Sequence, residues 1–315
     1  MLSVNHVLSS RTLPSGIFDD LYRRLVAAAP ADLTLSCAVR PDRAAALRHY
    51  HRPHRERRLI GPAVATVHHD PRDAHAWLRL PDFLPRWREC VKVICLNAGQ
   101  QALLADHGIT ATEVIPHGVD RRVLPPPPAP RPLPDGRVRL GLVSKRYARG
   151  VKGEDRLERL FAALDPARFA FVLAGEGRWR DAAAARVRGF AVECFEALPY
   201  RLFGALYDRM DVLLILSDFE GGPACLPEAL GAGVPVAARP VGMVPDWLRD
   251  GDNGLVLDDA TLVEQVAALA DPDRLARLKA GAFAGAPAIP AWEDVLARQI
   301  AVYRAVYHAV GGGAR

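Results

Sequence analysis

Short apolar runs alternate with longer amphipathic stretches along the first part of the chain. The apolar runs have the length of buried strands, and the amphipathic stretches have helical spacing. The predicted strands are Val4–Ser9, Leu33–Val39, Val64–Val67, Val91–Leu96 and Thr112–Ile115, and the predicted helices are Ile17–Ala29, Phe83–Glu89 and Gly99–His107. This alternation predicts a parallel sheet covered by helices on both faces.

A proline-rich stretch interrupts the alternation. Residues Val123 to Gly136, "VLPPPPAPRPLPDG", include seven prolines, so neither a helix nor a central strand can continue through them. We predict a semi-rigid linker over 123–136, between an N-terminal Rossmann-like domain of residues 1–122 and a second one of residues 137–290.

The alternation starts again after the prolines. Strands are predicted within "VRLGLVS", "FAFVLAGEG", "AVECFEAL", "DVLLILS", "VPVAARP" and "GLVLD", and helices at Asp155–Ala163, Asp181–Arg188, Tyr200–Arg209, Pro227–Leu230 and Ala260–Ala270. A last helix within residues 291–315 is expected to pack back toward the N-terminal domain. Doubly wound α/β domains bind ligands at the carboxyl ends of their strands, so we expect two such domains to face a cleft that holds the site.

The composition is ordinary for a globular protein. Of 315 residues 50% are hydrophobic, yet no apolar run approaches the roughly 18 residues of a membrane span. The N-terminal "MLSVNHVLSS" lacks the basic start and unbroken apolar run of a signal peptide, which predicts a cytoplasmic protein. Five scattered cysteines indicate neither a disulfide framework nor a zinc site.

Arginine carries almost all of the positive charge, and the densest basic run is "RHYHRPHRERR", Arg48 to Arg58. Such a run is typical of a solvated loop in an arginine-rich protein, or of a patch that contacts an anionic acceptor or a membrane surface. Peripheral membrane contact through a basic N-terminal surface therefore stays open. No nucleic-acid motif accompanies the charges, so we expect no nucleic acid partner.

Two glutamates, Glu220 and Glu228, flank a Gly-Gly-Pro turn in "SDFEGGPACLPEALGAGVPV". This loop follows a buried strand and leads into a short helix, which we predict to begin at Pro227. Outward amides and the helix dipole favour an anion there, so the carboxylates must face neutral donors such as sugar hydroxyls. A nucleotide-diphosphate sugar, which carries hydroxyl groups on both sides of an anion, fits this arrangement.

The diphosphate of such a ligand needs cations, and "GLVSKRYARGVKGEDRL" supplies them. Lys145 and Arg146 follow the first strand after the prolines, and Lys152 lies in the same loop. Because the chain has only four lysines, two within one strand-end loop indicate a phosphate-binding loop rather than a solvated turn.

These motifs resemble the retaining glycosyltransferases of family 4, which have the GT-B fold. Glu220 to Glu228 is similar to the E-x7-E motif of the family, and Lys145-Arg146 to Lys152-Gly153 is similar to its G-R-x-x-x-x-K-G. "TVHHD", "VICLNAGQQALLADHGITATEVIPHGVD", "VLAGEG" and "VGMVPDWLRDGDNGLVL" resemble further segments of the family, in order along the chain.

The chain also departs from the family. Val241-Gly242 stands where the family has Gly-Gly, Asp246 where it has a glutamate, and His117 where an asparagine is common. The N-terminal domain is short, and its first loop, "LPSG", offers only Gly16 where the family often has two glycines. That domain holds the acceptor in the family, so the acceptor, whether a glycan, a lipid-linked molecule or a small molecule, stays unidentified.

The resemblance implies a role for each matching residue. Glu228 would bind the ribose and Glu220 the hydroxyls of the donor sugar, while Arg146 and Lys152, with Lys145 as a third cation, would balance the diphosphate. The other implied donor-binding residues are Gly221, Gly222, Ala224, Cys225 and Leu226, through their backbone amides, and Tyr200 near the base.

The resemblance also places a histidine beside the donor sugar. His68 is the first candidate for this catalytic position and His69 the second, and His69 and Gly16 are assigned to the acceptor side. Neighbouring residues of "HHD" cannot all point one way from a strand, so we expect no metal site there. No cofactor is expected besides the nucleotide-sugar donor.

The function implied by the family is metal-independent transfer of a hexosyl group with retention at the anomeric carbon. A glycoside hydrolase would need the paired carboxylates but not the basic loop. A dinucleotide oxidoreductase would need G-x-G-x-x-G after the first strand, which is missing. A GT-B protein that binds nucleotide sugars without turnover remains the alternative, because the N-terminal domain is short.

Overall fold

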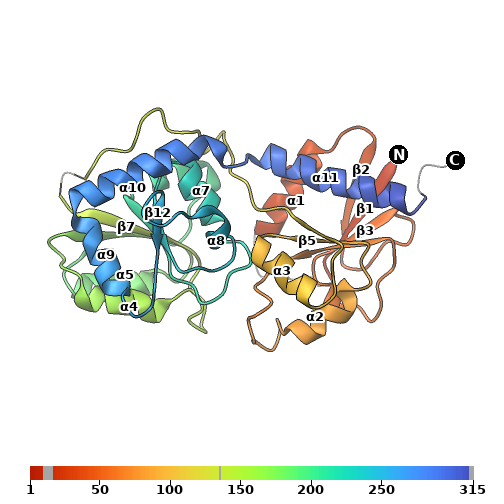
Figure 1. The fold of residues 1–315 in the computed structure, drawn as a ribbon, viewed down its shortest axis with the longest axis horizontal. Helices are drawn as coiled ribbons and strands as arrows, with labels where there is room; N and C mark the ends of the chain where they lie inside the picture. The colour runs from red at the N-terminus through yellow and green to blue at the C-terminus, as the bar shows by residue number, and fades with distance from the viewer. Residues whose placement is uncertain (10–16, 135, 312–315) are drawn as a thin grey trace. The chain divides into compact units, whose positions relative to one another are not determined.

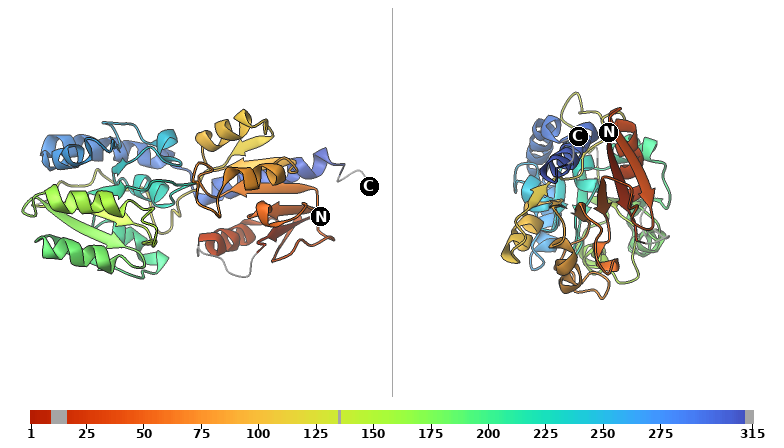
Figure 2. Two further views of the ribbon diagram at one scale, coloured as in Figure 1. Left: turned by 90° about the horizontal axis from the view of Figure 1, so that it is seen from below. Right: turned by 90° about the vertical axis from the view of Figure 1, so that its right-hand side faces the viewer.

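The computed structural model describes residues 1–9, 17–134 and 136–311. They form two compact units: the first combines Met1–His117 with the C-terminal stretch from Trp292, and the second spans Gly118–Ala291. Each unit contains a six-stranded sheet in which the neighbouring strands run parallel. Figure 2 shows helices on both sides of the sheet in each unit. The prediction of two doubly wound α/β domains is therefore confirmed.

The sheet of the first unit has the strand order β2-β1-β3-β4-β5-β6. The strands are β1 (Leu2–Val7), β2 (Leu33–Ala38), β3 (Leu47–Tyr50), β4 (Ala63–Val67), β5 (Lys92–Cys95) and β6 (Thr112–Val114). After β2 the chain crosses back over β1 and adds the remaining strands on the other side. The strand order thus reverses between β1 and β3, which is where ligands bind in open sheets of this kind.

Among the residues that the structure describes, four helices cover the first sheet. Helices α1 (Ile17–Ala28) and α11 (Trp292–Ala309) lie on one face, and α2 (Leu80–Trp87) and α3 (Ala98–Asp106) lie on the other (Figure 1). The C-terminal helix α11 packs on apolar side chains of β1, β3 and β4, among them Val4, Leu47 and Val64. The last helix of the chain is therefore part of the first unit.

The basic run from Arg48 is not a solvated loop over its whole length, which corrects that interpretation of its first residues. Arg48, His49 and Tyr50 belong to β3, a buried strand between β1 and β4, and His51 directly after it is buried too. The Arg48 guanidinium donates to the backbone oxygens of Asp42, Arg43 and Gly61, which satisfies a buried cation. Only the later arginines of the run, Arg55, Arg57 and Arg58, are exposed.

The sheet of the second unit has the strand order β12-β11-β10-β7-β8-β9. The strands are β7 (Val138–Val143), β8 (Phe169–Ala174), β9 (Ala191–Phe195), β10 (Val212–Ile215), β11 (Val236–Ala238) and β12 (Gly254–Val256). This order is that of a dinucleotide-binding sheet, and it reverses between β7 and β10.

Helices cover both faces of the second sheet as well. Helices α4 (Glu154–Ala163), α5 (Trp179–Val187) and α9 (Leu262–Ala267) share one apolar core with the sheet, and α6 (Phe203–Tyr207), α7 (Cys225–Gly231) and α8 (Val244–Trp247) share the other. The sequence analysis missed α10 (Pro272–Gly285), although its start is well marked. The Asp271 carboxylate accepts hydrogen bonds from the first amides of this helix, and Pro272 opens it.

The proline-rich segment, which we predicted to be a semi-rigid linker, packs against the second unit. Leu124 is buried in the core of this unit, and Arg131 forms an ion pair with Asp208 at 2.9 Å. The buried Lys279 donates to the backbone oxygen of Pro132 at 2.5 Å. The boundary between the two compact units falls between His117 and Gly118, so the segment belongs to the second unit.

Among the described residues, no helix is long and apolar enough to cross a membrane.

Candidate active site

The loops that carry the predicted donor site all leave the carboxyl edge of the second sheet. Lys145, Arg146 and Lys152 lie between β7 and α4, and Glu220 lies between β10 and α7. Since β7 and β10 are the two strands at which the order reverses, these loops flank the crevice that doubly wound sheets use for ligands.

Gly153 lets the two loops approach each other closely. Its φ of +78° lies in the left-handed region, and a Cβ atom there would lie 2.2 Å from the backbone oxygen of Leu216. Any other residue would push the start of α4 away from the end of β10. The glycine therefore holds the neighbouring Lys152 against the loop that carries Glu220.

Lys152 and Glu220 form an ion pair in which Nζ and Oε1 are 2.5 Å apart. The side chains are only 17% and 12% exposed, and the Ser217 hydroxyl donates to the same carboxylate oxygen at 2.7 Å. Burial lowers the pKa of Lys152, but the charge and hydrogen bond of Glu220 outweigh burial and raise it overall. Lys152 is therefore protonated at neutral pH, with its charge held at the reversal point of the sheet.

A second glycine supports the Glu220 loop from the other side. Gly242 has a φ of +56°, and a Cβ atom there would lie 2.9 Å from the backbone oxygen of Glu220 and 3.0 Å from Pro223. Of positions 241 and 242, only 242 therefore requires glycine, and the chain has Val241 at the other.

Glu228 lies in α7, which begins at Cys225 and not at Pro227 as predicted. The residue is 7% exposed, and its carboxylate accepts a hydrogen bond from the Tyr207 hydroxyl at 2.8 Å. Burial, and then the negative charge of Glu228, raises the pKa of Tyr207 far above its usual value, so the phenol stays a donor. The sequence analysis missed Tyr207, because nothing in its local pattern indicates that it faces α7.

Arg178 is a further residue that the sequence did not single out. It is fully buried, and its guanidinium donates to the Ser144 backbone oxygen at 2.8 Å and to Asp181 at 2.7 Å. Asp181 in turn pairs with Arg146 at 3.1 Å, and Glu154 lies 3.3 Å from Arg178. Arg178 thus ties together the end of β7 and the starts of α4 and α5, which positions Arg146.

The other residues predicted to bind the donor lie on the surface, in the Glu220 loop and at the start of α7. Lys145 pairs with Glu176 at 2.5 Å on the surface. Gly221, Gly222 and Ala224 follow Glu220 in its loop, while Cys225 and Leu226 are the first residues of α7.

Tyr200 follows β9, the strand at the edge of the second sheet. Its ring centroid lies 4.9 Å from that of Phe203, which lies 6.4 Å from that of Tyr207. This aromatic row links Tyr200 to Tyr207, the hydrogen-bond partner of Glu228.

The predicted catalytic histidine His68 and the predicted acceptor-side residues belong to the first unit. His68 and His69 directly follow β4, and burial lowers their pKa values to about 3 and about 4, so both imidazoles are neutral at pH 7. The His68 Nε2 is hydrogen-bonded to Nδ1 of His51 at 2.8 Å, and the His69 ring packs on Phe83 with centroids 4.4 Å apart. Gly16 lies outside the described residues.

Comparisons with known proteins agree with this geometry. Residues 138–271 match the protein-family model described as Glycosyl transferases group 1, and this range includes Lys152, Glu220 and Glu228. The "Vi polysaccharide biosynthesis protein VipC/TviE" of Salmonella typhi is 32% identical over 112 residues, which cover 34% of this chain. The match covers 19% of that protein, so it spans only about a fifth of the relative's length.

Solved structures of other proteins resemble the fold of the chain. Sucrose-phosphate synthase from Thermosynechococcus elongatus has a TM-score of 0.75 at 17% identity, and the match covers 98% of this chain and 100% of that one. HepE of Anabaena, in complex with UDP and glucose, has a TM-score of 0.70 at 16% identity, covering 97% and 100%. The chain therefore has the fold of GT-B glycosyltransferases, and residues 138–271 of its second unit are similar to the glycosyl transferases group 1 family.

Proposed function

We propose that the protein is a glycosyltransferase that moves a hexosyl group from a nucleotide-diphosphate sugar to an acceptor, with retention at the anomeric carbon. The observation that carries this proposal is the pair Lys152 and Glu220. Lys152 offers a protonated amine for the diphosphate, and Glu220 offers a carboxylate for sugar hydroxyls. The two groups lie next to each other where the strand order reverses, inside the residue range that matches glycosyl transferases group 1. HepE, which shares the fold, was solved with UDP and with UDP-glucose.

The donor would lie along the carboxyl edge of the second sheet. Glu228, oriented by Tyr207, would accept hydrogen bonds from the ribose, and Glu220 would accept them from the donor sugar. Arg146 and Lys152 would face the diphosphate and stabilise the negative charge that develops on it as the bond to the sugar breaks. Each charge–hydroxyl or charge–phosphate hydrogen bond of this kind contributes about 1.5–3 kcal/mol.

No divalent ion is needed at the diphosphate in this proposal. Arg146 and Lys152 supply two positive charges at the end of β7, and the buried Arg178 holds Arg146 in place through Asp181. An oxygen of the leaving diphosphate would take the proton of the acceptor hydroxyl on the same face of the sugar, which accounts for retention. We therefore expect that Mg²⁺ and Mn²⁺ do not stimulate turnover.

His68 would contribute a neutral imidazole beside the donor sugar. Its pKa of about 3 means that it acts through hydrogen bonds rather than through a positive charge at physiological pH. His69 would lie on the acceptor side.

The acceptor in this proposal is a growing glycan, a lipid-linked sugar or a small molecule. The name of the Salmonella typhi relative, a polysaccharide biosynthesis protein, favours a glycan. A cytoplasmic enzyme that acts on a lipid-linked acceptor would touch the membrane surface peripherally, and the exposed Arg55, Arg57 and Arg58 of the first unit would suit anionic lipids.

A donor screen followed by a turnover assay tests the proposal. Unfolding temperatures are first measured with UDP-, GDP- and ADP-sugars, and release of nucleoside diphosphate is then followed with the stabilising donor and a panel of glycan acceptors. Turnover of many donor molecules per enzyme, equal with and without Mg²⁺ or Mn²⁺, supports a metal-independent transferase. Donor binding without turnover would identify a binding-only protein, and binding of no nucleotide sugar would overturn the proposal.

A further inference from the structure

The ten histidines of the chain all belong to the first unit, and three of them gather at one place in it. His6 lies near the end of β1 and His49 is its register partner on β3, so the two side chains lie on the same face of the sheet. His51 follows His49 by two residues and points to the same side. The three residues therefore lie at the strand reversal between β1 and β3.

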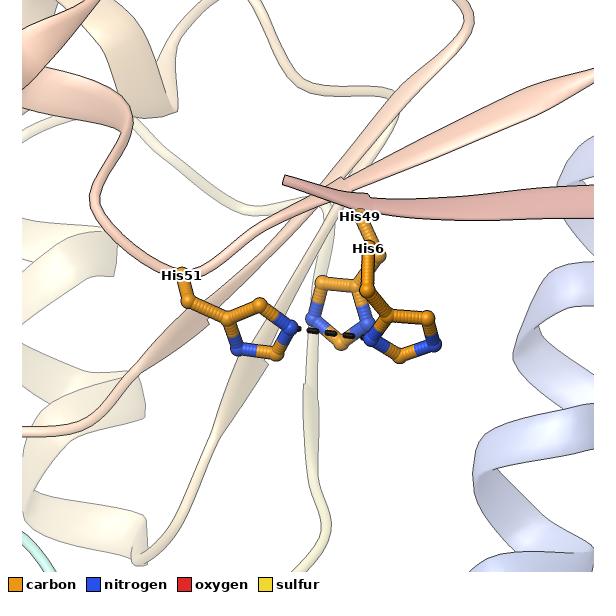
Figure 3. Close-up of side chains that lie close together, drawn as sticks. All are labelled: His6, His49 and His51. Atoms are coloured by element: carbon orange, nitrogen blue, oxygen red, sulfur yellow. Dashed lines mark hydrogen bonds between the residues drawn. The ribbon is translucent and has the colours of Figure 1, made fainter. Parts of the chain in front are cut away.

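The three imidazole rings point toward one another (Figure 3). One ring nitrogen from each lies within 4.8 Å of the others, and Nδ1 of His6 is 2.9 Å from Nε2 of His51. Two nitrogen ligands of a tetrahedral zinc ion lie about 3.3 Å apart, given a bond length of about 2.0–2.1 Å. Side-chain shifts of up to about 1.5 Å would therefore convert this cluster into a ligand set.

The ring nitrogens on the far sides of the cluster already have hydrogen-bond partners. Nδ1 of His51 is bonded to His68 at 2.8 Å, and Nε2 of His6 lies 3.4 Å from the Tyr303 hydroxyl. His49 is bonded to Tyr303 on one side and to Thr66 on the other, so either nitrogen could ligate while its opposite keeps a partner. Metal-binding histidines nearly always have such a partner, because it fixes the ring and places its proton away from the metal.

A small cavity next to the cluster offers room for a fourth ligand. Its volume is about 20 Å³, which is enough for about one water molecule, and its lining includes His49, His51, Thr66 and His68. Nδ1 of His117, which also lines it, is buried and has no hydrogen-bond partner in the described structure. A water molecule in this cavity would satisfy His117 and complete a tetrahedral site.

We propose that His6, His49 and His51 bind one divalent transition-metal ion, with Zn²⁺ as the physiological candidate and a water molecule as the fourth ligand. Three imidazoles without a carboxylate suit zinc or cobalt and disfavour magnesium and calcium, which require oxygen ligands. The ligands all belong to the first unit, whereas the side chains proposed for the diphosphate all belong to the second. The proposed ion is therefore separate from any metal ion at the diphosphate. Its binding can be measured without an assay of catalytic activity.

Metal binding would also determine where the proton of His68 lies. With Nε2 of His51 on the metal, Nδ1 of His51 carries the proton and must donate to Nε2 of His68. His68 then carries its own proton on Nδ1. The site would thus connect the stability of the first unit to the orientation of the histidine that follows β4.

Cobalt binding to the full chain tests the proposal. The protein is purified without a histidine tag, treated with a chelator, dialysed and titrated with Co²⁺. We expect one ion per chain, the intense visible d–d bands of four-coordinate cobalt, displacement of these bands by Zn²⁺, and a higher unfolding temperature with Zn²⁺. X-ray absorption of the zinc form should show imidazole scattering from three ligands.

Matched histidine variants identify the ligands. His49→Phe and His51→Asn should each weaken Co²⁺ binding at least tenfold, while His308→Ala, at an exposed position of α11, should bind as the wild type does. If the variants do not fold, the wild-type spectrum and the X-ray absorption data still decide the question. Absence of stoichiometric binding, a spectrum of six-coordinate cobalt, or unchanged binding in the folded His49→Phe variant would each overturn the proposal.

Discussion

Lys152→Ala removes the cation that the structure places at the strand reversal of the second sheet. Its Nζ atom is the partner of Glu220 at 2.5 Å and is largely shielded from water, so the charge acts in a medium of low dielectric constant. If Lys152 contacts the leaving diphosphate, the substitution removes a charge-assisted hydrogen bond of about 1.5–3 kcal/mol. A tenfold change in rate corresponds to about 1.36 kcal/mol, so kcat/KM should fall roughly 10- to 160-fold.

The assay follows release of nucleoside diphosphate with the donor selected by the screen, at donor concentrations on both sides of KM. Unfolding temperatures of the variant show whether the loss reflects misfolding, since Glu220 keeps the Ser217 hydroxyl as a partner after the substitution. Lys92→Ala is the matched control, because Lys92 lies on a strand of the first unit, far in sequence from the domain that matches glycosyl transferases group 1. A kcat/KM for Lys152→Ala within twofold of the wild-type value would refute the assignment of Lys152 to the diphosphate.

Three further predictions follow from buried groups. Glu228→Ala should weaken binding of bare nucleoside diphosphate, whereas Glu220→Ala should leave that affinity nearly intact and reduce transfer, as isothermal titration and the turnover assay will show. Arg178→Met should lower the free energy of unfolding by about 3–5 kcal/mol in chemical denaturation, because it removes the cation beside buried Glu154 and leaves buried Asp181 with Arg146 alone. The free energy of unfolding of the first unit should fall as pH drops from 6.5 toward 4, because burial holds the pKa values of His54 and His69 at about 4 and the unfolded chain then binds more protons.

Exposed residues of the second unit supply controls for the first two of these predictions. Glu264→Ala should alter neither nucleotide binding nor transfer, and Arg180→Met, two residues after Arg178, should change the stability little. Equal losses of diphosphate affinity at both glutamates would show that their roles are misassigned. Urea unfolding of the double variant His54→Phe/His69→Phe should depend less steeply on pH than that of the wild type, and an unchanged slope would contradict the titration argument.

Features that depend on local spacing could be predicted from the sequence. Three features follow each other within a few residues: the strand before Ser217, the Gly-Gly-Pro turn and the short helix with Glu228. Their order and their chemistry can therefore be inferred directly from the sequence. The Lys145–Lys152 loop was found for the same reason. The start of α7 was misjudged by two residues because Pro227, which suits the first turn of a helix, stands at its third position instead.

Strand β3 could not be predicted, because its residues look polar. Arg48 and His49 suggest a solvated segment, yet both are buried, since backbone oxygens of two neighbouring loops accept every hydrogen bond that the Arg48 guanidinium donates in this structure. The acceptors are supplied by the fold of the surrounding chain, not by the run itself. The periodicity of a sequence shows which side chains are apolar. It does not show which polar side chains will form hydrogen bonds in the folded protein.

The strand order explains why the candidate chemistry of each unit is found where it is. In the second unit the reversal between β7 and β10 brings Lys152 to Glu220, and in the first the reversal between β1 and β3 brings His6 to His51. At such a point the helices that follow the two strands lie on opposite faces of the sheet. The loops therefore diverge, and side chains from the two strands can lie close together there. The sequence contained a family motif for the first pair and none for the second, and for that reason the histidine cluster could be recognised only once the order of the strands was known.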